Sequence, residues 1–250
     1  MIVLKKIGKY ALTFCTLIII VILLLTLACL IPSRSLKENV KKSSEVLVEE
    51  GNRKNYFSIA SFSNHQFDNF TDALLINMAY SVDNEKPMYS AFIGRKNYIK
   101  DITEKVTEDF VGDLKSSSKY TRLDQVHELY DVANGEAKES FEYARYWHGD
   151  LIFLRPLLAI FDYVQIRIIN STILFLLAMY LIVLIYKKFG NVLAVIMFLS
   201  LFAIDYFYIG LSIMCMPNII IMMLFAIYLI KKDKNIKDYG ILFFIVRSIN

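Results

Sequence analysis

Long, mostly apolar stretches alternate with lysine-bearing segments along the chain. Four stretches consist mostly of Leu, Ile, Phe, Val and Ala, and they occupy residues 10–31, 168–186, 191–209 and 213–230. A helix needs about 20 apolar residues to cross ~30 Å of hydrocarbon, and only a helix can satisfy all its backbone N–H and C=O groups within one segment. The pattern therefore predicts four membrane-spanning helices.

The lysines predict how these helices are oriented. Three lysines lie in residues 1–9, two separate the second span from the third at 187–188, and four lie in residues 231–238. Short cytoplasmic segments carry an excess of Lys and Arg. We therefore expect a multi-pass protein of the cell membrane with a cytoplasmic N-terminus, and we place residues 32–167 outside the cytoplasm.

Composition agrees with this interpretation. Hydrophobic residues make up 56% of the chain and the mean hydropathy is +0.45, whereas ordinary globular chains are about 45–50% apolar. The outer segment 32–167 holds 18 Lys and Arg and 21 Asp and Glu, a net charge of −3. Nucleic acid is an unsuitable partner for a net acidic domain, so the bilayer is the partner that the sequence indicates.

The two ends of the chain carry further signals. The first apolar run, of about 22 residues, is longer than the 7–15 of a cleaved signal peptide, so residues 10–31 are interpreted as an uncleaved anchor. Residues 239–250 begin a new apolar run that is too short to cross a bilayer. We interpret them as the start of a truncated fifth span, and hence the chain as a fragment of a longer polytopic protein.

The outer segment is expected to be mainly helical. Phe67, Phe70, Leu74 and Met78 recur at helical spacing, which predicts an apolar stripe on one face. Polar residues 33–55 suggest a connecting helix or linker at the membrane surface, and the aromatic and basic segment 142–165 suggests an interfacial element. The predicted fold class is an all-α, polytopic helical membrane protein with a mainly helical extracytoplasmic domain.

Two acidic residues on this helix are the first candidates for chemistry. Asp68 and Asp72 are separated by four positions, so their carboxylates share one helix face. Paired carboxylates can act as a general base or hold a divalent cation. The alternative is a solvated polar face opposite the apolar stripe.

A second group of candidates precedes the second span. Arg145 and Arg155 are suited to gripping a phosphate, because the guanidinium group pairs in bidentate fashion. Trp147 could stack on a sugar ring or lipid headgroup, and His148 adds a titratable imidazole. The alternative is an aromatic belt at the headgroup level with snorkelling arginines.

The segments Asp68–Ala79, Arg145–Gly149 and Leu154–Leu157 resemble multispanning proteins of Gram-positive bacteria. Their layout is similar to that of GT-C-type glycosyltransferases, which use polyprenyl-phosphate sugars as donors. The resemblance implies that Asp72 or Asp68 is the acidic residue of the first external loop, acting as a base or as the ligand of a divalent cation. It also implies that Arg145 and His148 lie near the donor phosphate. No cofactor is otherwise evident from the sequence.

These observations leave two hypotheses open. In the first, the protein is an enzyme that transfers a sugar from a lipid-phosphate donor to a cell-envelope acceptor. In the second, it is a non-catalytic membrane subunit or sensor of a cell-envelope assembly. Transport is less favoured, because the later spans carry almost no charge and no paired broken helices.

Overall fold

The computed structural model describes residues 2–58, 61–98, 124–135, 139–143 and 148–232. Helices account for 71% of the described residues and strands for 8%, so the expectation of a mostly helical protein is confirmed. The chain divides into two compact units, which are described separately. The first comprises residues 1–56, 64–167 and 212–214, and the second comprises residues 57–63, 168–211 and 215–250.

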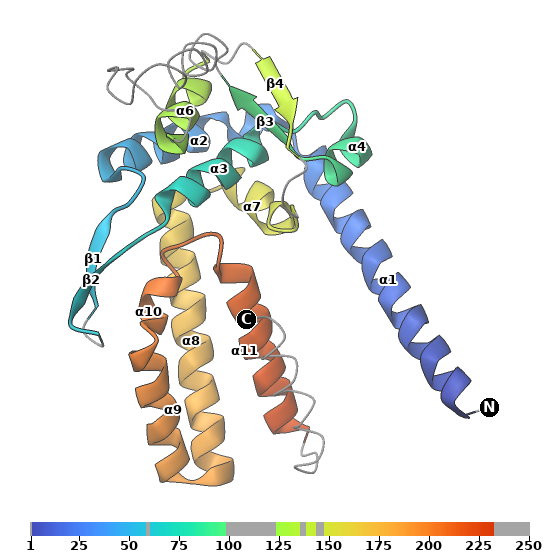
Figure 1. Cartoon of the computed structure of the whole chain (residues 1–250), viewed down its shortest axis with the longest axis vertical. Coiled ribbons are helices and arrows are strands. Elements are labelled where there is room, and N and C mark those ends of the chain that lie inside the picture. The colour runs from blue at the N-terminus through green and yellow to red at the C-terminus, as the bar shows by residue number, and fades with distance from the viewer. Residues whose placement is uncertain (1, 59–60, 99–123, 136–138, 144–147, 233–250) are drawn as a thin grey trace, which may run out of the picture. The chain divides into compact units, whose positions relative to one another are not determined.

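Helices dominate the first unit (Figure 1). In chain order its elements are α1 (Ile2–Leu30), α2 (Ser33–Glu50), α3 (Asn69–Tyr80), α4 (Pro87–Phe92), β3 (Arg95–Tyr98), α6 (Gln125–Ala133), β4 (Glu139–Glu142) and α7 (Leu151–Leu158). Strands β3 and β4 pair antiparallel, with Arg95 opposite Glu142.

The predicted connecting helix α2 is amphipathic and forms part of the core. Leu36, Val40 and Leu47 recur on one face and are fully buried, because α2 packs against α3, α6 and α7. Burying such side chains stabilises the fold by about 1.5–3 kcal/mol each. The buried apolar stripe of α2 is therefore not apparent from the largely polar composition of residues 33–55.

Helix α3 is buried on nearly all sides. Residues 72–79 are all buried, and they include Asp72, whose side chain belongs to the predicted polar face. Leu74 and Met78 of the predicted stripe are buried, while Phe67 and Phe70 are half-buried. The interpretation of a solvated polar face is therefore wrong for Asp72.

The end of α1 is held by side chains from elsewhere in the first unit. The helix stops at Leu30, and the following Pro32 cannot continue the hydrogen-bond ladder. The Asn84 amide nitrogen donates to the carbonyls of Cys29 and Ile31, at 2.8 Å each. Its oxygen accepts from the Ser33 N–H at 2.9 Å, so one side chain joins the end of α1 to the start of α2.

Two short strands that the sequence analysis missed precede α3. They are β1 (Asn55–Ser58) and β2 (Ser63–Gln66), which form a two-stranded hairpin. Strands of four residues without alternating polarity give too weak a periodic signal for prediction.

The second unit contains the later apolar helices. They are α8, which begins in the first unit and spans Tyr163–Phe189, then α9 (Asn191–Ala203), α10 (Tyr206–Ile209) and α11 (Met216–Lys231). Leu174, Ala178, Leu181 and Ile185 of α8 pack with side chains of α9 and α11, while large apolar side chains on the other helix faces are exposed.

Two described helices are long and apolar enough to cross a membrane, namely residues 10–30 and α8. The predicted third span, 191–209, is not continuous. Asp205 adopts a left-handed conformation (φ 52°) between α9 and α10, which Asp tolerates better than most residues. The predicted fourth span begins at Met216 rather than at 213. The run 239–250 lies outside the described residues.

Candidate functional site

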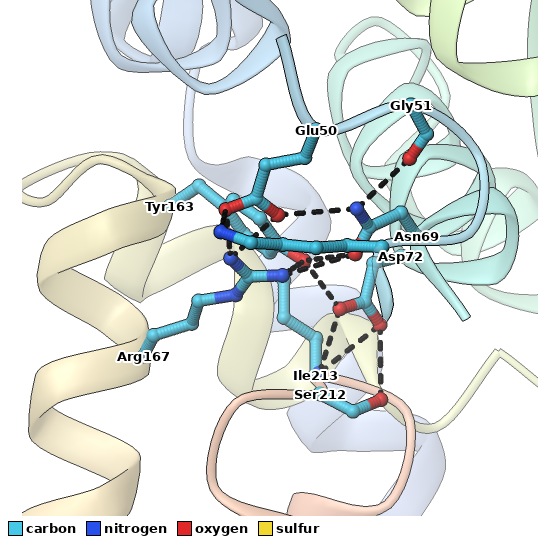
Figure 2. Close-up of polar contacts among 9 residues, drawn as sticks. Glu50, Gly51, Asn69, Asp72, Tyr163, Arg167, Ser212 and Ile213 are labelled. Atoms are coloured by element: carbon cyan, nitrogen blue, oxygen red, sulfur yellow. Dashed lines mark hydrogen bonds and ion pairs between the residues drawn. The ribbon is translucent and has the colours of Figure 1, made fainter. Parts of the chain in front are cut away.

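Asp72 is the most enclosed of the predicted site residues. Its side chain lies in the first turn of α3, and the residue is 1% exposed. The Tyr163 hydroxyl donates to one carboxylate oxygen at 2.7 Å. The backbone N–H groups of Ile213 (3.0 Å) and Met214 (3.3 Å) and the Ser212 hydroxyl (3.3 Å) reach the other oxygen. Figure 2 shows Asp72 between Tyr163 and the segment that carries Ser212 and Ile213.

Arg167 forms the second half of this site. Tyr163 and Arg167 are separated by four positions in α8, so they lie on one helix face. The guanidinium carbon lies 3.9 Å from the centroid of the Tyr163 ring, and one terminal nitrogen donates to the Tyr163 hydroxyl at 2.5 Å. The other terminal nitrogen donates to both carboxylate oxygens of Glu50, at 2.9 Å each.

Asn69 and Lys54 complete the hydrogen bonding. The fully buried Asn69 accepts from Arg167 at 3.0 Å and donates to Glu50 at 3.1 Å and to the Gly51 carbonyl at 2.9 Å. Lys54 donates to Glu50 at 2.8 Å. We call Glu50, Asn69, Asp72, Tyr163 and Arg167 the Asp72 cluster. A continuous path of hydrogen bonds joins its two carboxylates through Arg167 and Tyr163.

The pKa values of the two carboxyl groups of the cluster are shifted in opposite directions. Burial raises the pKa of Asp72 to about 6, although hydrogen bonds from Tyr163 and Ile213 and the charge of Arg167 act against this rise. Burial also acts to raise the pKa of Glu50, but hydrogen bonds from Lys54 and Arg167 outweigh it, so that pKa is lowered. A carboxyl group with a pKa near 6 can both release and accept a proton close to neutral pH.

Asp68 lies apart from this chemistry. It is exposed and caps the N-terminus of α3, accepting from the Thr71 N–H at 3.1 Å and from the Thr71 hydroxyl at 2.6 Å. This is the usual role of Asp at an N-cap. The structure therefore separates the two predicted carboxylates into an exposed cap and a buried member of the cluster.

His148 is buried at another place in the first unit. Its ring lies so close to Gly94 that a Cβ atom there would come within 2.4 Å of the ring. Burial lowers the pKa of His148, which favours the neutral imidazole. Arg145 and Trp147, the neighbouring predicted site residues, lie outside the described residues.

Arg155 is fully buried among backbone carbonyls. Its Nε donates to the Ala28 carbonyl at 2.9 Å, and its terminal nitrogens donate to the carbonyls of Ala79 and Ile31. These carbonyls lie at or just beyond the C-terminal ends of α1 and α3, where positive charge is favourable. Burial nevertheless lowers the pKa of Arg155 to about 10. A substrate phosphate could reach this side chain only if the surrounding helices separated.

Sequence reasoning missed Glu50, Asn69, Tyr163 and Arg167. The sequence did contain one signal, since Arg167 stands directly before a long apolar run, where a charge calls for a partner. Among the described residues no group of three or more His, Cys, Asp and Glu side chains could hold a metal ion. The oxygens of Asp72 are instead occupied by hydrogen-bond donors.

Comparison with known proteins adds no family to this picture: no protein-family model, no curated protein and no solved structure matches the chain.

Proposed function

We propose that the chain is a multi-pass membrane protein whose first unit, apart from α1, lies on the outer face, with the N-terminus in the cytoplasm. Residues 10–30 and α8 have the length and hydropathy that a membrane-spanning helix needs. Helices α9 and α10, together with α11, would complete the passes. Lys187 and Lys188 lie in the last turn of α8, and Lys231 is the last residue of α11, as expected for cytoplasmic turns.

We further propose that the protein transfers a sugar from a lipid-phosphate donor to a cell-envelope acceptor, with Asp72 as the base. The observation that carries this proposal is the buried carboxyl group with a pKa of about 6, fixed between Tyr163 and residues 212–214. Strongly perturbed pKa values gather at functional sites. Such a group is mostly ionised at neutral pH and is still basic enough to take up a proton.

In this reaction the proton of the acceptor hydroxyl moves to the Asp72 carboxylate. The acceptor oxygen forms a bond to the anomeric carbon while the bond from that carbon to the phosphate oxygen breaks, and the phosphate leaves with the electron pair. Because Asp72 is 1% exposed, the acceptor must replace donors of residues 212–214. Tyr163 and Arg167 keep the carboxylate in place meanwhile.

The test compares Asp72→Asn with Tyr163→Phe and Ser212→Ala in membranes supplied with a labelled polyprenyl-phosphate sugar, at matched protein levels. Asp72→Asn is expected to abolish transfer. Ser212→Ala, which keeps the carboxylate and its bond from Tyr163, should reduce transfer only as far as it reduces stability. Tyr163→Phe removes a bond that holds the carboxylate in place, so it should lower transfer further without abolishing it. If all three variants lose activity in proportion to their loss of stability, Asp72 is not the base.

The burial of Asp72 also favours the second candidate, a non-catalytic membrane subunit or sensor of a cell-envelope assembly. Both carboxylate oxygens accept hydrogen bonds, and such an arrangement can serve structure alone. This candidate predicts that the envelope glycan is unchanged in a strain that carries Asp72→Asn at a normal protein level.

A further inference from the structure

The hairpin before α3 interrupts a charged part of the chain. Between Lys54 and Asp68 no Lys, Arg, Asp or Glu occurs, although residues 33–54 and the segment after α3 are rich in them. A loop exposed only to water seldom lacks charge over so many residues. Seven of the thirteen residues 55–67 are Ser, Asn, His or Gln, and the other six are Tyr, Phe, Ile or Ala. The hairpin therefore has the uncharged, mixed composition of a segment at a boundary between water and an apolar phase.

Two phenylalanines are exposed near the turn of this hairpin. Phe57 is 53% exposed and Phe62 is 81% exposed. Phe62 also has a positive φ of 51°, which is uncommon for a bulky residue and costs free energy. A strained backbone that holds an aromatic ring outward points to a partner for that ring.

The turn belongs to the second unit, together with the apolar helices. The Tyr208 hydroxyl of α10 donates to the Phe57 carbonyl at 3.3 Å, and Figure 1 shows this end of the hairpin beside α10. Ile204 (60% exposed) and Phe207 (42% exposed) extend the exposed apolar surface around α10. Tyrosine is enriched where membrane helices meet the headgroups. In the proposed membrane placement, Tyr208 and the Phe57 to which it is hydrogen-bonded therefore lie at the level of the headgroups.

Three serines of the hairpin, Ser58, Ser61 and Ser63, have hydrogen bonds with one another. The Ser61 N–H donates to the Ser58 hydroxyl at 3.2 Å, and the hydroxyls of Ser61 and Ser63 are 2.7 Å apart. Polar groups that are already hydrogen-bonded cost less to remove from water than unpaired ones. This lowers the free-energy cost of moving the turn from water to the headgroup region.

We propose that Phe57 and Phe62 of this hairpin insert into the outer leaflet of the bilayer, with their rings at the boundary between headgroups and acyl chains. The inference rests on the membrane placement in the proposed function and is independent of glycosyl transfer. Aromatic side chains bury their rings at this boundary and leave the adjoining backbone near water. The hairpin would then be a third contact with lipid, in addition to α1 and α8, and one that does not cross the bilayer.

The experiment uses the full chain in phosphatidylcholine–phosphatidylglycerol vesicles, with lipids brominated either near the headgroup or near the methyl end. Tryptophan replaces Phe62, and the fluorescence of the wild-type chain, which contains one tryptophan, is subtracted. Phe141→Trp is the matched control, because Phe141 is also exposed (40%) but lies in a strand with Glu139 and Glu142. Leu176→Trp, at an exposed position of α8 (60%), reports on the membrane placement itself.

We expect Phe62→Trp to lose fluorescence in proportion to the content of lipid brominated near the headgroup, and Phe141→Trp to lose none. If Leu176→Trp is quenched and Phe62→Trp is not, the inference about the hairpin is overturned and the membrane placement stands. If neither is quenched, the membrane placement itself fails. A blue shift of Phe62→Trp that grows with protein concentration, without quenching by bromine, would show that a second copy covers the turn and would also overturn the inference.

Discussion

Two arginines are enclosed in the first unit, and the structure balances their charges differently. Arg167 pairs with the Glu50 carboxylate and stacks on the Tyr163 ring. Arg155 donates to three backbone carbonyls, and no described salt bridge involves it. The partners of Arg167 can change charge with pH, whereas the carbonyls around Arg155 cannot. The difference separates a site that can respond to protonation from one that fixes helices in place.

The largest effect is expected at Arg155. Replacing Arg155 with Met removes three buried hydrogen bonds from a charged donor. Each such bond contributes about 1.5–3 kcal/mol, so the free energy of unfolding should fall by about 5 kcal/mol. Thermal unfolding in detergent measures the loss, with the exposed Arg34→Met as control. A loss no larger than that of the control would show that the carbonyls find other donors.

The next effect is expected at Glu50. Glu50→Gln leaves the Arg167 guanidinium enclosed without its carboxylate, which costs about 3–5 kcal/mol. The neighbouring and exposed Glu49→Gln is the matched control. Because an unpaired charge causes most of this loss, the double variant Glu50→Gln/Arg167→Met should be more stable than Glu50→Gln alone. A double variant that is less stable would contradict the account.

Stability should also depend on pH through Asp72. Its pKa is raised to about 6 in the folded protein from 3.8, so the folded state binds more protons than the unfolded state between these values. Stability from this group is therefore present below about pH 4 and is lost as the pH rises through 6, by up to about 3 kcal/mol.

Unfolding of the wild type and of Asp72→Asn from pH 4 to 7 measures this term. The wild type should lose stability relative to the variant as the pH rises. The lowered pKa of Glu50 acts in the opposite direction, but it is present in both proteins and cancels in the difference. A pH-independent difference would show that Asp72 has an ordinary pKa.

The smallest effect is expected for Tyr163→Phe. This change removes the hydroxyl that donates to Asp72 and accepts from Arg167, and a hydrogen bond to a charged group contributes about 1.5–3 kcal/mol. Residual donors from Ile213 and Met214 should keep the loss near the lower limit. The same pH series should then show a higher pKa for Asp72 than in the wild type.

The sequence predicted the features that depend on local pattern. Continuous apolar runs predicted the helices around residues 10–30 and 168–186, because about 20 consecutive apolar residues favour one long helix. The apolar stripe with Leu74 and Met78 predicted α3, because its spacing matches the period of a helix. The break at Asp205 was missed, because a left-handed residue inside an apolar run leaves no periodic signal.

The candidate site was predicted only in part, because its partners lie far apart in the chain. Asp72 was selected as a carboxylate on a helix, but its contact with Ile213 joins residues 141 positions apart. Arg155 was selected because arginine suits phosphate, and composition alone cannot reveal that its donors face carbonyls. Whether Asp68 or Asp72 is buried also depends on packing that the spacing of the two does not encode.

The joint at the end of α1 has a mechanical consequence. Asn84 and Arg155 together hold the carbonyls of Ala28, Cys29 and Ile31, so α1 cannot swivel about its last turn without breaking several bonds at once. Arg155 also grips Ala79 in α3, the helix that carries Asp72. If α1 crosses a bilayer as proposed, a change in bilayer thickness that tilts α1 would act as a torque on α3, and the first helix would be a lever on the Asp72 carboxylate.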